Sequence, residues 1–143
     1  MKKSIFIILT IFLIITIAIS YFLWESQRRV ESANRINQEY NTYYDKTILG
    51  TDVASIINKT IDQNEKNKIE KDENNVYLEN ETNSIKIYLK FLESDDTFLM
   101  EAISNRGIES FIKYYSASNF KCTSIEYHEK TKYVKSLTFE QVQ

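Results

Sequence analysis

The pattern of apolar and polar positions changes sharply along this chain, and the longest apolar run comes first. Ile5–Trp24 is a run of twenty residues without a charge. Its only polar members are Thr10, Thr16, Ser20 and the amphipathic Tyr21. Twenty helical residues span about 30 Å, which is the thickness of the hydrocarbon core of a bilayer. The pattern predicts a transmembrane anchor over residues 1–24, with the lipid bilayer as its first partner.

A cleaved signal peptide is the alternative interpretation of the same run. Lys2 and Lys3 form a basic start, and Ala18-Ile19-Ser20 fits a small-x-small cleavage site, which would leave a secreted protein. The run nevertheless continues to Trp24, where an aromatic side chain suits the membrane interface. We therefore expect a retained single-pass anchor in the cell membrane. The short tail before it favours a cytoplasmic N-terminus and a C-terminal domain outside.

Residues 25–50 lack a strong helix breaker until Gly50, and apolar side chains recur in them at steps of three and four. They are Val30, Ala33, Ile36, Tyr40 and Tyr43. This spacing is typical of a helix with one apolar stripe. We expect the membrane helix to continue to about residue 45, as a helical stalk over residues 25–50.

Residues 51–143 are expected to form one small extracytoplasmic domain. After Gly50, Thr51 or Asp52 is a credible N-cap for a helix over Thr51–Gln63, whose apolar side chains keep helical spacing. The same spacing after Gly107 predicts a second short helix that includes Phe111. Residues 98–104 fit either a short helix or a strand.

Three further runs predict strands, the first by its alternation and the other two by their content of β-forming residues. Ser84–Leu92 places Ile87 on a buried face and Lys86 on the exposed one, and Val76–Glu79 is expected to pair with it through a turn at residues 80–83. Phe120–His128 and Lys132–Glu140 predict a terminal hairpin. The predicted fold class is therefore α+β with an antiparallel sheet, and the first soluble helix should pack on the Ile87 face.

Composition excludes several classes of function. The chain has 143 residues, with 18 basic and 20 acidic side chains and no long basic stripe, so nucleic acid is not an expected partner. The chain has only two glycines, too few for the glycine-rich loop that binds phosphate groups. The single cysteine cannot form an internal disulfide, so the domain must depend on its apolar core.

Candidate chemistry is sparse. Cys122 and His128 lie six residues apart on one predicted strand, about 20 Å, whereas a nucleophile–base pair needs about 3 Å. Cys122 is expected to be a small buried residue and His128 an exposed hairpin residue. The acidic side chains of Glu93, Asp95 and Asp96 lack a calcium-loop pattern. We expect no catalytic, cofactor or metal site, and we do not expect the protein to be an enzyme.

The layout resembles that of type IV pilin-like proteins of bacteria. A short basic tail, an apolar helix from residue 5, its polar continuation and a C-terminal sheet carry the resemblance. Tyr40-Asn-Thr-Tyr-Tyr44 and Gly50-Thr-Asp-Val53 look similar to segments of Tad-type pilus-associated proteins. The resemblance implies a structural or assembly component of an envelope or pilus-like complex that associates with itself or with a protein partner, and it carries over no functional residue.

A binding or regulatory module for a membrane partner is the alternative function. Such a module would need a pocket, and the tyrosines are the side chains best suited to line one. The candidates are Tyr40, Tyr43, Tyr44, Tyr114 and Tyr115.

Overall fold

The computed structural model describes residues 2–143, except for the side chains of Lys2, Ser4, Arg29, Ser32 and Ala33. The expectations that used the side chains of Lys2 and Ala33 therefore lie outside the described residues. The chain divides into two units, Met1–Arg35 and Ile36–Gln143. The compact unit thus begins earlier in the sequence than the expected domain of residues 51–143.

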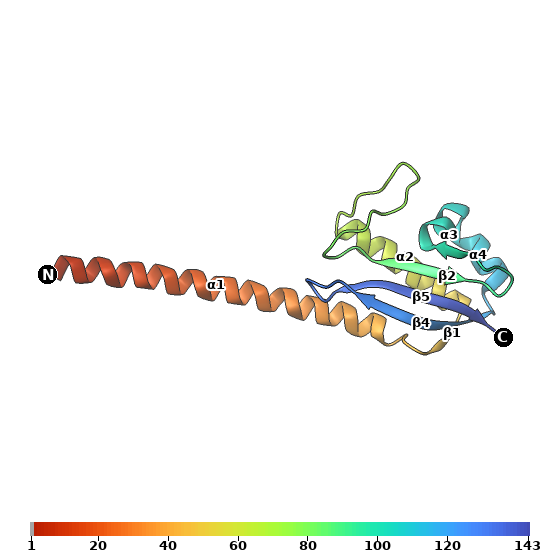
Figure 1. The fold of residues 1–143 in the computed structure, drawn as a ribbon, viewed down its shortest axis with the longest axis horizontal. Helices are drawn as coiled ribbons and strands as arrows, with labels where there is room; N and C mark the ends of the chain where they lie inside the picture. The colour runs from red at the N-terminus through yellow and green to blue at the C-terminus, as the bar shows by residue number, and fades with distance from the viewer. Residues whose placement is uncertain (1) are drawn as a thin grey trace. The chain divides into compact units, whose positions relative to one another are not determined.

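Four helices and five strands make up the described chain (Figure 1). In order they are α1 (Lys2–Asn41), β1 (Thr47–Leu49), α2 (Gly50–Lys66), β2 (Lys86–Lys90), β3 (Thr97–Leu99), α3 (Met100–Arg106), α4 (Ile108–Tyr115), β4 (Asn119–Tyr127) and β5 (Val134–Val142). The α+β class is as predicted. The first helix ends at Asn41 and β1 follows, so the helix is shorter than the expected stalk to residue 50.

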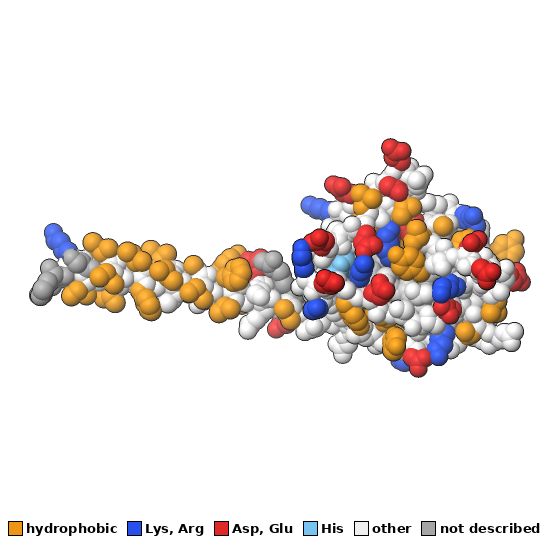
Figure 2. All heavy atoms as spheres, in the orientation of Figure 1, with side chains coloured by type: hydrophobic (Ala, Val, Ile, Leu, Met, Phe, Trp, Pro, Cys, Tyr) orange, Lys and Arg blue, Asp and Glu red, His pale blue; other side chains and the backbone are white. Residues whose placement is uncertain are grey.

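Residues 2–35 of the first unit are a continuous stretch of α1. Its segment Ile5–Arg28 is long and apolar enough to cross a membrane, and none of it is buried within the protein. Figure 2 shows the hydrophobic side chains that cover this segment. At its end, Arg28 lies 4.8 Å above the ring of Trp24.

The second unit is built on one five-stranded sheet in the order β1-β4-β5-β2-β3. The predicted terminal hairpin is confirmed, because β4 and β5 pair antiparallel. The expected fully antiparallel sheet is wrong in one place, since β2 pairs parallel with β5. That pairing joins segments far apart in sequence, and the local pattern of neither strand specifies its direction.

Helices α2, α3 and α4 pack against one another and against the apolar face of the sheet. Ile87 of β2 is fully buried, as are its neighbour Leu137 and the helix residue Ile57. The predicted packing of the first soluble helix on the Ile87 face is therefore confirmed. The largest side chains of this core are Phe120, Phe139, Ile57, Ile85, Ile87, Leu89, Met100 and Leu137.

Helix α2 begins at Gly50 with Leu49 as its N-cap, so the expected cap at Thr51 or Asp52 lies two or three residues too late. Asp52 instead accepts a hydrogen bond from the backbone N–H of Leu49 at 3.4 Å. Gly50 is required by space, because a Cβ there would lie 1.9 Å from the carbonyl oxygen of Tyr115. The glycine that was expected to break the chain therefore lets α2 start against the end of α4.

The expected hairpin of Val76–Glu79 with Ser84–Leu92 is wrong. The turn exists, since the side-chain oxygen of Asn80 accepts hydrogen bonds from three backbone N–H groups of residues 82–84, at 2.8 to 3.0 Å. The segment before it instead lies against residues 70–72, through an isolated bridge between Tyr77 and Lys71 and a hydrogen bond from the backbone N–H of Leu78 to the oxygen of Glu70 at 2.7 Å. Strand β2 takes β5 and β3 as its neighbours instead.

Lys86 is buried, which corrects the expectation that it faces solvent. Its ammonium forms an ion pair with Glu101 of α3 at 2.9 Å and also donates to the backbone oxygen of Tyr77. The pairing of β3 with β2 covers only Tyr88–Lys90, so the edge of β2 at Lys86 is left to the segment around Tyr77. The alternating pattern indicated the face of the strand, but not what covers its edge.

We predict that Lys86→Ala destabilises the domain by about 3–5 kcal/mol, because it leaves the carboxylate of Glu101 buried without its counter-charge. The exposed Lys90, which pairs with Glu140, should tolerate alanine within about 1 kcal/mol. Chemical denaturation of the full-length protein in detergent would measure both. Equal sensitivity at the two lysines would contradict the prediction, and the double variant Lys86→Met/Glu101→Leu should recover most of the loss.

Candidate functional site

Cys122 and His128 do not form a site together. Cys122 is fully buried in β4, as expected, and its thiol lies 3.7 Å from the backbone oxygen of Ser124. Burial raises the pKa of this thiol to about 11. His128 has a separate partner, because its Nε2 lies 2.7 Å from the backbone oxygen of Ser84.

His128 is only 3% exposed, so the expectation of an exposed hairpin residue is wrong. The reason is that the turn between β4 and β5 docks on the turn at Asn80. Thr131 donates a hydrogen bond to the backbone oxygen of Thr82 at 2.5 Å, and Lys130 pairs with Glu81. Two turns that are distant in sequence thus enclose the imidazole between them.

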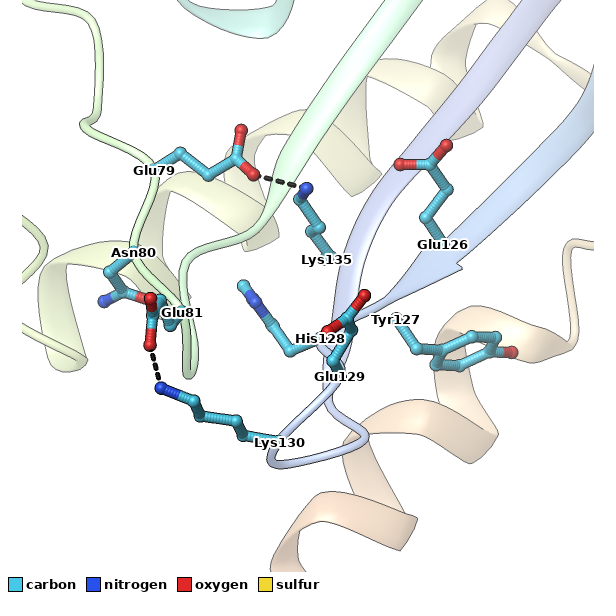
Figure 3. A pocket seen from close by; sticks show the side chains of 9 residues that line it. All are labelled: Glu79, Asn80, Glu81, Glu126, Tyr127, His128, Glu129, Lys130 and Lys135. Carbon is cyan, nitrogen blue, oxygen red and sulfur yellow. Dashed lines mark hydrogen bonds and ion pairs between the residues drawn. The ribbon is translucent and has the colours of Figure 1, made fainter.

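A charged pocket of about 460 Å³ lies beside these two turns (Figure 3). It is lined by Glu79, Asn80, Glu81, Glu126, Tyr127, His128, Glu129, Lys130 and Lys135. Three of its four carboxylates already have partners. Lys135 pairs with Glu79, Lys130 pairs with Glu81, and the hydroxyl of Ser136 donates to Glu126 at 3.1 Å.

The ion pair with Glu79 raises the pKa of Lys135, so this lysine is held in its charged form. The ring of Tyr127 points away from the other side chains of the pocket (Figure 3). Its hydroxyl donates to Asn41 at 2.5 Å. The charges of the pocket are therefore used to hold the two turns together. Among the residues that the structure describes, no group of three or more His, Cys, Asp or Glu side chains is placed to hold a metal ion.

Glu93, Asp95 and Asp96 lie in the connection from β2 to β3. The backbone N–H of Asp96 donates to the hydroxyl of Ser94 at 3.1 Å, so a local turn organises this segment. Glu93 lines a second pocket, which has a different character from the charged one.

The second pocket is an aromatic groove of about 440 Å³ between the β2–β3 connection and helices α3 and α4. It is lined by Phe91, Glu93, Ser94, Phe98, Ile103, Arg106, Gly107, Ser110, Phe111, Tyr114 and Tyr115. A volume of this order, with mostly apolar walls and a few polar groups, is typical of binding sites. We therefore take this groove as the candidate site and call it the aromatic groove.

Phe91 organises the floor of the aromatic groove. Its ring meets Phe98 edge-on at 5.4 Å, Tyr115 at 4.8 Å and Phe120 at 6.0 Å. Rings at these distances and tilts stabilise one another. Because Phe120 is fully buried, the floor of the groove is continuous with the core.

The rim of the groove is exposed and carries both charge signs. Tyr114 is 73% exposed, and the ammonium of Lys113 lies 5.6 Å from its ring centre. Arg106 and Glu93 also line the groove, and neither has an ion pair within the described part of the chain. The arrangement can bind an apolar side chain and present hydrogen-bonding groups around it.

The five tyrosines expected to line one pocket are separated in the structure. Tyr114 and Tyr115 line the aromatic groove, whereas Tyr43 borders a different pocket of about 180 Å³. Tyr40 is buried, with its hydroxyl 3.0 Å from that of Thr60, and burial raises its pKa. Tyr44 is 58% exposed on the surface.

Sequence reasoning missed the aromatic groove because it assigned Phe91 to the buried face of a strand. The strand ends at Lys90, and Phe91 is only partly buried beside Phe98. The signal that could have found it is the pair of phenylalanines on either side of a short acidic turn.

No protein-family model, curated protein or solved structure matches this chain.

We predict that Cys122 of the folded protein does not react with a thiol reagent at pH 8, because its raised pKa of about 11 keeps it protonated and its side chain is buried. Unfolding should restore ordinary reactivity. Mass spectrometry after brief alkylation, with and without denaturant, measures both states. Rapid labelling of the folded chain would show that the thiol is accessible.

Proposed function

We propose that this protein is a single-pass membrane protein that acts by non-covalent association, as a structural or assembly component of an envelope or pilus-like complex. In this proposal the N-terminus lies in the cytoplasm and the compact unit lies outside the cell membrane. The observation that carries it is the segment Ile5–Arg28, an apolar helix that no other part of the chain buries. Exposing such a helix to water is unfavourable, and a bilayer removes that cost.

The polar end of this segment supports the membrane interpretation. The rings of Tyr21 and Trp24 lie 6.4 Å apart, and Arg28 stacks above Trp24. Amphipathic aromatic side chains next to a basic one suit the boundary between hydrocarbon and headgroups. A signal sequence near the N-terminus has the same general composition, so cleavage is the alternative that experiment must separate.

The last turn of α1 is built into the compact unit. Asn37 donates to the backbone oxygen of Lys132 at 2.5 Å and accepts from the backbone N–H of Val134 at 2.8 Å. Tyr40 of the same turn is buried and contacts Thr60 of α2. In the proposed role the compact unit thus begins with the end of the anchoring helix itself.

A binding or regulatory module for a membrane partner is the second candidate function, and the aromatic groove favours it. Apolar patches rimmed by polar groups on a small domain are typical of interaction sites. The two candidate functions differ in the partner. An assembly component associates with further copies of this chain, whereas a binding module associates with a single different protein.

We predict that the full-length protein stays with membranes after an alkaline carbonate wash, because extracting about twenty apolar residues from a bilayer is costly. Fractionation followed by mass determination of the chain provides the measurement. A soluble mature chain that begins near Tyr21 would contradict the anchor and support a cleaved signal.

We predict that amine-reactive crosslinking in native membranes gives a ladder of products at multiples of 16.9 kDa, the mass of one chain. Self-association of a structural subunit produces such a ladder, whereas a module with one partner produces a single heterologous band. Immunoblotting measures the products. A single heterologous band would replace the assembly role by the binding role.

A further inference from the structure

We propose that copies of this chain associate edge to edge, with Tyr44 of one copy inserted into the aromatic groove of the next. This inference deepens the proposed assembly role and rests on it. The contact is heterologous, because the inserted side chain and the groove lie on different surfaces of the same subunit.

Tyr44 and Phe98, one of the residues that line the groove, lie at opposite edges of one sheet. Strands β1 and β3 are the first and last in the sheet order, so each has one edge without a neighbouring strand. Phe98 belongs to β3, and the groove extends from it along α4 to Tyr115, whereas Tyr44 bridges to β4 next to β1. With about 4.8 Å between neighbouring strands, the two edges are separated by about 20 Å.

Tyr44 and the groove also lie on one row of paired residues across the sheet. Tyr44 pairs with Cys122, and Cys122 pairs with Phe139. Phe139 pairs with Leu89, which pairs with Phe98 of the groove. A copy displaced along this row therefore brings its Tyr44 to Phe98, at the β3 end of its neighbour's groove.

Tyr44 has the form of a preorganised insert. Its side chain is 58% exposed, yet the backbone around it is fixed to β4. The backbone N–H of Asp45 donates to the oxygen of Cys122 at 2.9 Å, and the N–H of Cys122 donates to Lys46 at 3.1 Å. Holding an aromatic side chain in place before contact lowers the entropy lost on association.

The groove has the size and the surface that an aromatic side chain needs. Its floor is the cluster around Phe91, and the half-open space of about 440 Å³ holds a ring together with part of its flanking backbone. Aromatic side chains and arginine are the groups most enriched at the centres of protein interfaces. Arg106 at the groove provides such a side chain.

The acidic part of the groove rim is complementary to the lysine beside Tyr44. Lys46 is exposed there and has no ion pair within the described residues. Beside the groove, Glu93, Asp95 and Asp96 are likewise without ion pairs in that part of the chain, and they outnumber the two cations of the rim, Arg106 and Lys113. Opposite charges at the rim of an interface select the correct partner and orientation.

Cysteine crosslinking of the full-length protein in native membranes tests this contact. In a chain that also carries Cys122→Ser, the pair Thr47→Cys, near Tyr44, and Ser110→Cys, at the groove, should yield, with a short bis-maleimide, a ladder of products beyond the dimer. Each single variant should stop at the dimer, because a ladder requires both surfaces on every copy. Thr47 and Ser110 are exposed, so the substitutions leave the core intact and keep the tyrosines that form the contact.

The pair Glu129→Cys and Ser110→Cys is the matched control, since Glu129 is exposed in the turn between the inner strands β4 and β5. The proposal is overturned if the Thr47 pair gives no product beyond the dimer, or if the Glu129 pair gives the same ladder. If the unmodified protein still gives a ladder with the amine-reactive crosslinker, self-association stands and its contact lies elsewhere on the domain.

A charge exchange provides an independent readout. Lys46→Glu should lower the yield of the ladder about two- to fivefold, because it turns an attraction across the rim into a repulsion. Adding Glu93→Lys should restore the yield. A loss that Glu93→Lys does not restore would overturn the placement of these two side chains in one interface.

Discussion

The burial of one apolar layer between the sheet and helix α2 is the interaction on which the rest of the domain depends. The chain has a single cysteine and therefore no internal disulfide, so this layer must offset the conformational entropy of folding. Ile57 of α2, Ile87 of β2 and Phe139 of β5 are fully buried in it. The position of α2 over the sheet is set at its first residue, because only glycine at position 50 allows the helix to start against the carbonyl oxygen of Tyr115. This close approach also fixes the end of α4, which forms one wall of the aromatic groove.

The buried pair of Lys86 and Glu101 is a second constraint of a different kind. A buried ion pair contributes little net stability, because the desolvation of both charges opposes their attraction. Here it fixes an arrangement, since the same ammonium also donates to the backbone oxygen of Tyr77. The polar network continues outward, where the hydroxyl of Tyr77 donates to Glu65 at 2.6 Å and Lys71 reaches the same carboxylate at 2.7 Å. These contacts lower the pKa of Glu65 and keep it ionised. A long segment without regular secondary structure is thereby tied to α2 and α3.

Local patterns predicted those parts of the fold that local interactions determine. Helices α2 and α4 were predicted from the helical spacing of their apolar side chains, and the β4–β5 hairpin from two runs of β-forming residues on either side of a turn. The parallel pairing of β2 with β5 was not, because it joins residues such as Leu89 and Phe139 that are fifty positions apart. The burial of His128 depends on two turns that meet only in the folded chain. The aromatic groove was missed for the same reason, since its walls come from the β2–β3 connection, α3 and α4, and no one of these segments carries the pattern of a site.

Attachment to a membrane changes what a small surface contact can achieve. Two copies in one bilayer meet at a high effective concentration, so a contact too weak to hold soluble molecules together can still organise tethered ones. Exposed sheet edges normally carry a risk of unspecific pairing, and natural proteins limit it by keeping edge strands short and charged. Both edge strands of this sheet have only three residues, and acidic or basic side chains lie beside each. Little backbone is therefore free to pair. Side chains such as Tyr44, and the groove that can receive it, then determine which surfaces of two copies associate.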